Sequence, residues 1–131
     1  MLALTVLQPW ATLIVLGHKT LETRTYSPRH LGRIAIHASS SPRGFDLAEN
    51  CAPLVKFMNS QSLDIRSLPR GAVIGECEIV KVAGFEPSSD LSMHGWLANG
   101  GFTWHLSNAT PYPTPITAMG FVRLWQWERP E

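Results

Sequence analysis

The sequence predicts an α+β protein, mainly β, in which short strands form a small, partly open β-barrel plugged by one or two helices. Ten prolines and ten glycines among 131 residues indicate many turns. Short apolar or alternating segments, typical of strands, recur between these turns. Only two segments, residues 9–16 and 45–58, show the helical spacing of apolar side chains. At this length we expect residues 1–131 to form one domain.

The N-terminal part of the chain predicts a strand, a helix and two further strands. Residues 2–7 form a short apolar run typical of a buried strand. A proline at the first position suits the helix expected over residues 9–16, because its missing N–H is not needed there. Gly17 provides the left-handed end of that helix. Residues 19–26 and 32–38 alternate in polarity and predict strands, so we expect the helix to plug the core between them.

The middle of the chain predicts a second helical region and a long strand. Residues 45–58 have helical spacing, and Pro53 is expected to kink or split the helix. A polar loop is expected over residues 59–68. Residues 72–82 carry the longest strand pattern, and residues 83–101 are irregular, which is compatible with a helical turn or a lid.

The C-terminal part is expected to contain a strand over residues 102–106 and a connection over residues 108–115, where prolines occupy alternate positions. Residues 116–127 are expected to close the chain. Three side chains of this last segment are expected to be packed: Phe121, Leu124 and Trp125.

Charge is distributed unevenly along the chain. The net charge is +1, but residues 1–43 hold five basic residues against one acid, and the remainder holds six against nine. This asymmetry predicts a local anion-binding face rather than a generally basic protein, the alternative being chance clustering. Cys51, Cys77 and the scattered histidines fit no disulfide or zinc spacing. We therefore expect buried thiols in a reducing compartment, no metal and no cofactor.

No targeting or membrane segment is expected. Residues 1–16 carry no charged side chain, but they lack a basic leader region and are interrupted by a Gln-Pro pair. The run is also shorter than the roughly 20 residues that cross a bilayer. The sequence therefore favours a cytoplasmic protein.

The strongest functional signal is the charged stretch that follows the first helix. Lys19 could hold a phosphate or act as a base or nucleophile, or it could be an ordinary exposed lysine. Glu22, Arg24 and Tyr26 share one face of the expected strand. Glu22 and Arg24 could form a structural ion pair. Alternatively, Arg24 could bind a phosphate or base edge while Glu22 orients Lys19 or accepts a proton.

Five further residues could reach the same cleft. Gln8 precedes the helix and could read a base edge, and Trp10 is either a core aromatic or a stacking platform. His37 and Ser39 end the next strand, although a satisfied, partly buried histidine is the alternative at position 37. Arg33, on the same strand, could face a phosphate.

These residues resemble those of the ASCH (activating-signal-cointegrator homology) domain family. The most specific match joins the Gln-Pro-Trp of residues 8–10 to the Gly-x-Lys-x-x-Glu-x-Arg of residues 17–24. The likeness extends in order over nearly the whole chain, through residues 4–11, 17–24, 32–39, 68–75 and 102–106, with Gly120, Leu124 and Trp125.

The resemblance implies a PUA-like β-barrel, related to RNA-binding domains, with a nucleic-acid or nucleotide site between the first helix and the barrel. The resemblance therefore implies a module that binds RNA or single-stranded nucleic acid, or a nucleotide or nucleoside. Carried over from the family, the cleft residues are Gln8, Pro9, Trp10, Lys19, Glu22 and Arg24.

Two alternatives stay open. The first is an enzyme of ribonuclease or amidohydrolase type, with Lys19 and Glu22 as the working pair and with acid–base groups also available from Tyr26 and His37. The chain departs from the acetylcytidine amidohydrolase motif Lys-Thr-x-Thr, because Glu22 stands in place of the nucleophilic threonine. Thr23 is one position away and is expected on the opposite face of the strand. The second alternative is a protein-interaction barrel without a nucleotide site.

Overall fold

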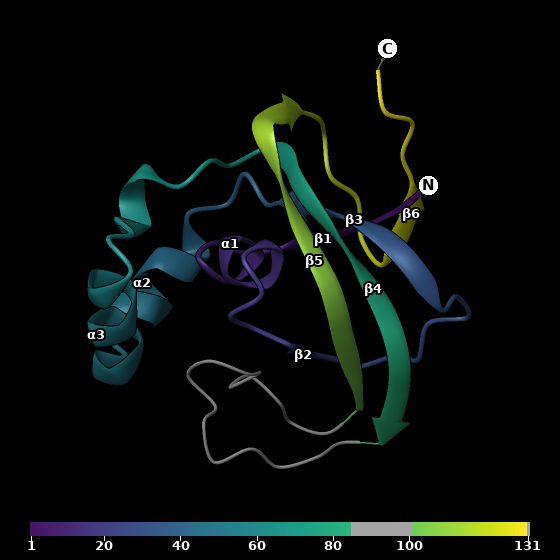
Figure 1. Ribbon diagram of the computed structural model, residues 1–131, viewed down its shortest axis with the longest axis horizontal. Helices are drawn as coiled ribbons and strands as arrows, with labels where there is room; N and C mark the ends of the chain where they lie inside the picture. Colours follow the sequence, from purple (N-terminus) through teal and green to yellow (C-terminus); the bar gives the residue numbers. More distant parts are fainter. Residues whose placement is uncertain (85–100, 131) are drawn as a thin grey trace.

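The computed structural model describes residues 1–84 and 101–130, and it confirms the predicted α+β, mainly β, class (Figure 1). The irregular region expected over residues 83–101 lies outside the described residues except at its ends. In the described part of the chain, no helix is long and apolar enough to cross a membrane.

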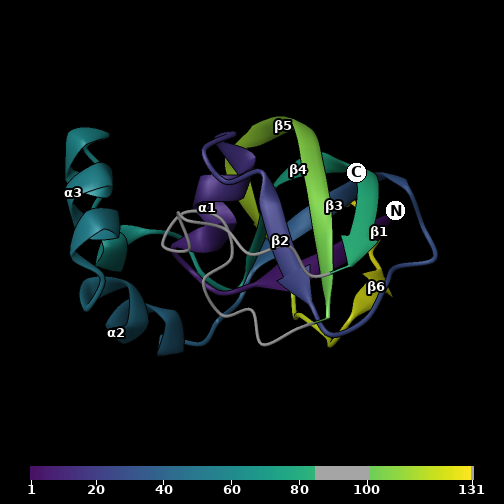
Figure 2. The ribbon, with the colours of Figure 1, turned by 90° about the horizontal axis from the view of Figure 1, so that it is seen from below.

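One curved sheet of six strands forms a half-barrel with the order β2-β5-β4-β3-β1-β6 (Figures 1 and 2). The β1–β3 pairing is parallel, and the other pairings are antiparallel. The two edge strands, β2 and β6, are the shortest. The strands are β1 (Leu2–Val6), β2 (Leu21–Arg24), β3 (Gly32–Ala38), β4 (Ala72–Gly84), β5 (Phe102–Thr117) and β6 (Leu124–Gln126).

Helix α1 (Trp10–Val15) plugs the half-barrel, as predicted. All six of its residues are buried, and Gly17 ends it with a φ of +80°. The helix lies very close to β4, because a Cβ atom at Gly75 would come within 2.7 Å of Val15 Cγ1 and 2.5 Å of the Thr110 carbonyl oxygen. A glycine is therefore required where the helix meets the sheet.

The second helical region is split, as the proline within it predicted. It consists of α2 (Arg43–Glu49) and α3 (Ala52–Ser60), with Pro53 in the first turn of α3, where a missing N–H costs nothing. A short 3₁₀ turn over Ile65–Ser67 follows in the expected loop. Figures 1 and 2 show α1 lying between the sheet and these two helices.

The prediction of a proline-rich connection over residues 108–115 is wrong, because β5 continues through it to Thr117. Strand β2 pairs only with residues 102–105 of β5, so among the described strands the later part of β5 has β4 as its sole neighbour. Such an edge position tolerates prolines, since their missing N–H groups are not needed for a second pairing. The register with β4 also shifts at three places, and at each shift the ladder of hydrogen bonds between the two strands is locally interrupted.

The C-terminal strand β6 pairs with β1, so the two ends of the chain lie together. Trp125 packs against a buried cluster on one side of the sheet, and Leu124 packs against the main core on the other. The expectation that Phe121 is packed is wrong, because its side chain is 57% exposed. It belongs to an irregular segment, residues 118–123, that connects β5 to β6.

Candidate nucleic-acid site

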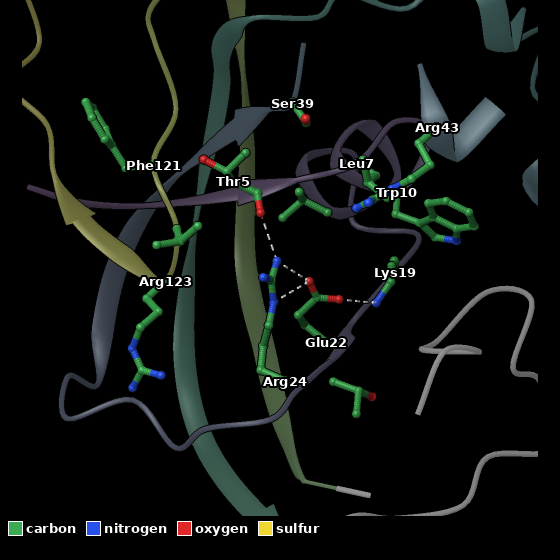
Figure 3. Close-up of a pocket in the computed structure, with 13 residues that line it drawn as sticks. Thr5, Leu7, Trp10, Lys19, Glu22, Arg24, Ser39, Arg43, Phe121 and Arg123 are labelled. Carbon is green, nitrogen blue, oxygen red and sulfur yellow. Dashed lines mark hydrogen bonds and ion pairs between the residues drawn. The ribbon is translucent and has the colours of Figure 1, made fainter. Parts of the chain in front are cut away.

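A cavity of about 380 Å³ opens where the end of β1 and the start of α1 face β2 across the gap in the half-barrel (Figure 3). Segment 118–123 supplies the outer wall. The lining residues, which we call the cavity residues, are Thr5, Val6, Leu7, Trp10, Lys19, Glu22, Thr23, Arg24, Ser39, Arg43, Phe121, Val122 and Arg123.

Lys19, Glu22 and Arg24 form one connected ion-pair group on a wall of the cavity. Lys19 Nζ lies 3.0 Å from Glu22 Oε1, and Arg24 Nη2 lies 2.9 Å from Glu22 Oε2. Lys19 Nζ also donates to the Leu21 carbonyl oxygen. Glu22 and Arg24 thus lie on one face of β2, and the structural ion pair that the sequence offered as one alternative is formed.

Local geometry explains this convergence. Gly17 ends α1, so the chain turns back and Lys19 enters the space beneath the helix. Glu22 and Arg24 are two residues apart on β2 and point the same way. Arg24 Nη2 also donates to the Thr5 carbonyl oxygen at 2.9 Å, which links β2 to β1 across the gap in the half-barrel.

The carboxyl group of Glu22 is held ionised by its two partners. Burial by itself raises the pKa of Glu22, since its residue is only 8% exposed. The charges of Lys19 and Arg24 and their hydrogen bonds outweigh burial and lower the pKa below its ordinary value. The group is thus a fixed negative charge that orders two cations.

Two further cations line the cavity and were not selected from the sequence. Arg43, at the start of α2, and Arg123, in segment 118–123, are both exposed. The Arg123 guanidinium lies 3.7 Å from the centre of the Tyr26 ring. Figure 3 shows Arg43 and Arg123 on opposite sides of the Lys19–Glu22–Arg24 group. The cavity residues therefore carry four basic side chains and one carboxylate.

Of the predicted cleft residues around α1, Trp10 and Ser39 line the cavity, whereas Gln8 and Pro9 are buried behind it. Gln8 is fully buried and its amide is engaged: Nε2 donates to Thr12 Oγ1 at 2.8 Å and to the Pro69 carbonyl at 2.7 Å. The amide oxygen accepts from the Thr12 N–H at 3.0 Å. Gln8 thus fixes the start of α1 and does not reach the cavity.

Tyr26 lies beside the cavity rather than in its wall. Its ring stacks edge-on against Trp104, at 5.3 Å between centroids, and supports Arg123. Its hydroxyl is buried and has no hydrogen-bond partner among the described residues. Burial raises the pKa of Tyr26, although nearby Arg24 and Arg123 act in the opposite direction. Tyr26 therefore positions a cavity cation from behind.

Arg33 does not share the cavity. Its Nε lies 3.0 Å from Glu76 and its Nη1 lies 3.5 Å from Glu78, both on β4, and it also donates to the Asn108 carbonyl at 3.0 Å. The alternation of β3 places Arg33 on the face of the sheet opposite the inward-facing Ile34. The prediction that Arg33 faces a phosphate in the cleft is wrong for this reason.

His37 is buried directly behind the cavity wall and does not line it. Its Nε2 donates to the Ala118 carbonyl at 2.7 Å, and its Nδ1 lies 3.2 Å from Thr5 Oγ1. Trp125 Nε1 donates to the same Thr5 hydroxyl at 3.1 Å, and that hydroxyl keeps its own proton, which a neutral imidazole can accept at Nδ1. Burial lowers the pKa of His37, against the effect of the Ala118 bond.

Several cavity residues had no signal in the sequence. Thr5, Leu7 and Val6 end an apolar strand, and Arg123 and Phe121 lie far from the N-terminal motif. Thr23, on the four-residue edge strand β2 beside the opening, also lines the cavity. Only the basic character of residues 1–43 pointed toward Arg43.

In residues 1–84 and 101–130, no group of three or more histidine, cysteine or carboxylate side chains is placed to hold a metal ion. Glu22 is the one carboxylate among the cavity residues, and both of its oxygens are paired with cations.

Comparisons with known proteins bear on the family and the fold of the chain. The family model described as the ASCH domain matches residues 4–115. The solved structure of ASCH from Zymomonas mobilis is 17% identical, with a TM-score of 0.52 and coverage of 88% of this chain and 72% of that one. Two point mutants of the same protein, also 17% identical and covering 88% of this chain, give TM-scores of 0.53 and 0.51 and are covered over 74% and 72% of their lengths. No curated protein matches the sequence. The solved structures share the fold of this chain.

Proposed function

The chain belongs to the ASCH domain family, and on this premise we propose that its cavity binds RNA or another single-stranded nucleic acid by enclosing one nucleotide. The observation that supports this most is the charge of the walls, where four basic side chains surround one carboxylate. A site of this kind attracts an anion, and the arginine guanidinium can bind a phosphate through two parallel N–H donors.

The two pairs of cations have different roles in this proposal. Lys19 and Arg24 are already bonded to Glu22, so their positions are fixed before a ligand arrives. Arg43 and Arg123 are exposed and form no ion pair with the described residues, so they are available to meet a phosphate. We assign the first pair to orientation and the second to phosphate contact.

The size and apolar content of the cavity favour a single nucleotide. Its volume of about 380 Å³ lies at the small end of the range of roughly 300–1,000 Å³ that ligand sites occupy. Leu7 supplies half-buried apolar surface beside the cations, backed by the buried Val6 and Trp10. Unstacked bases of single strands need such surface, whereas paired bases are not exposed for it.

An enzyme acting on RNA or on a modified nucleoside is the second candidate. The contact of 3.0 Å between Lys19 and Glu22 is the observation that favours it. However, each group is occupied by the other, and the lowered pKa of Glu22 makes it a poor proton donor at neutral pH. A Lys19→Ala variant that keeps ligand affinity but loses turnover would favour the enzyme, and loss of both would favour binding.

The test of the binding proposal is a salt titration of affinity with a fluorescein-labelled uridine octanucleotide. Each arginine that contacts a phosphate contributes about −0.7 to the slope of log affinity against log salt for a single strand. We therefore expect Arg43→Gln and Arg123→Gln each to weaken binding and to reduce the slope by about this amount. Fluorescence anisotropy over a series of salt concentrations measures both quantities.

Lys56→Gln is the matched control, because Lys56 is an exposed cation on α3 that does not line the cavity. It should leave affinity and slope unchanged. Affinity that does not depend on salt, or a loss in Lys56→Gln equal to that in Arg43→Gln, would contradict the proposal. The alternative of a protein-interaction barrel without a nucleotide site predicts that no nucleotide raises the melting temperature of the protein.

A further inference from the structure

Residues 118–123, which we call the rim segment, form the outer wall of the cavity. Three of its side chains are large, apolar and strongly exposed: Met119 at 77%, Phe121 at 57% and Val122 at 86%. Phe121 and Val122 also line the cavity. Phe121 and Val122 thus expose apolar surface at the cavity itself, and exposed apolar surface at a cavity is typical of a binding site.

The rim segment is fixed in place from behind. Its first carbonyl, that of Ala118, accepts the hydrogen bond from His37 Nε2 at 2.7 Å. The backbone of Gly120 lies against the same imidazole, because a Cβ atom there would come within 2.6 Å of His37 Cε1. The Phe121 ring meets Trp125 edge-on, at 5.4 Å between centroids. The exposed face of Phe121 is therefore preorganised, and a ligand does not have to order it.

The position of Phe121 separates it from the interior of the cavity. Figure 3 shows Phe121 at the outer end of the wall, away from Lys19, while Arg123 of the same segment lies nearer to Arg24. A planar group resting on Phe121 would thus sit outside the space that encloses the first nucleotide. It would still be close to the cations of the cavity.

We propose that the rim segment is a second subsite, in which the base of a neighbouring nucleotide stacks on Phe121 while the phosphate that links the two nucleotides faces the cavity cations. This inference rests on the proposed function and narrows it from a nucleotide to a strand of at least two nucleotides. Alternation of an aromatic side chain with basic ones is the arrangement by which proteins bind single strands. A nucleic acid also fits the excess positive charge beside the rim, which an uncharged apolar peptide does not.

Isothermal titration calorimetry with three probes tests this subsite: uridine 5′-monophosphate, a uridine pentanucleotide and an uncharged leucine-rich hexapeptide. Stacking of one base on an aromatic side chain changes affinity by roughly 5- to 150-fold. We expect the wild-type protein to bind the pentanucleotide more tightly than the monophosphate. Phe121→Leu should remove roughly that factor for the pentanucleotide alone, and Phe121→Trp should retain it.

Leu31→Ala is the control, since Leu31 is 60% exposed but does not line the cavity. It should change neither affinity, and equal melting temperatures of all variants would show that they are folded. The second subsite would be overturned if the wild-type protein bound the two nucleotides with equal affinity, or if Phe121→Leu weakened both equally. It would also be overturned if the hexapeptide, rather than the pentanucleotide, bound in a way that depends on Phe121. Failure of the wild-type protein to bind either nucleotide would instead refute the proposed function itself.

Discussion

Replacing Glu22 by glutamine removes the carboxylate of the cavity while nearly preserving the shape of the side chain. Glu22 is 8% exposed and its partner Lys19 is 3% exposed, so the substitution leaves a buried ammonium group without its counter-ion. Removing one member of a buried ion pair costs about 3–5 kcal/mol. We expect a value near the lower end, about 3 kcal/mol, because the amide oxygen and the Leu21 carbonyl still accept from Lys19.

Urea denaturation followed by tryptophan fluorescence measures this loss as a lower midpoint at an unchanged slope. The double variant Lys19→Met/Glu22→Gln should be more stable than the sum of the single effects predicts, since it removes both buried charges together. Glu49→Gln is the matched control. Glu49 also pairs with an arginine, at 2.6 Å, but in solvent, so its removal should leave the midpoint nearly unchanged.

The same variants differ in their response to acid. The pKa of Glu22 is lower in the folded protein than in the unfolded chain, so its contribution is present above the unfolded value of about 4.5 and is lost as the pH falls through the folded value. The wild-type protein should lose that stability in acid, and Glu22→Gln should not. A Glu22→Gln midpoint equal to that of Glu49→Gln would refute the claim that the Lys19–Glu22 pair is buried and coupled.

Three further predictions concern other parts of the molecule. His37→Gln should reduce the loss of stability that the wild-type protein shows as the pH falls below about 6.5, because burial lowers the folded pKa of His37 below that value; urea midpoints from pH 8 to 5 check this. Gly75→Ala should destabilise the fold by about 1–3 kcal/mol, since the new Cβ meets Thr110 and α1, and a lower melting temperature would show it. A thiol reagent should label half-buried Cys51 in the native protein but Cys77 only after denaturation, because burial raises the pKa of Cys77 to about 12; mass spectrometry counts the labels.

The parts of the fold that depend on local sequence could be predicted. The apolar run over β1, the proline that starts α1 and the glycine that ends it determine their elements within a few residues. Glu22 and Arg24 lie on one face because alternate residues of a strand must. The prolines of β5 led to a wrong prediction because their effect depends on contacts that are not local in sequence. Whether a strand position needs its N–H depends on its neighbours in the sheet, and those come from distant segments.

The burial of individual polar side chains could also not be predicted from the local sequence pattern. Gln8 and His37 have the residue type and the placement of ligand-binding groups, yet each is sealed by a distant partner. The Pro69 carbonyl accepts a hydrogen bond from the Gln8 side chain, and the Ala118 carbonyl accepts one from His37. A sequence pattern indicates that a polar group lies near a cleft, but not whether another part of the chain satisfies it first.

The charge of the cavity illustrates the same limit at the level of the site. The basic excess of residues 1–43 accounts for Lys19, Arg24 and Arg43, but the fourth cation, Arg123, belongs to the net acidic remainder of the chain. It reaches the cavity because β6 pairs with β1 and brings the rim segment against the end of β1. The interactions that hold it there, the Tyr26 ring and the hydrogen bond to His37, join residues about 80 or more positions apart. One wall of the cavity is thus determined by a short N-terminal motif, and the other is determined by strand pairing. A variant of Phe121 or Arg123 can therefore alter binding without any change in the motif that identifies the family.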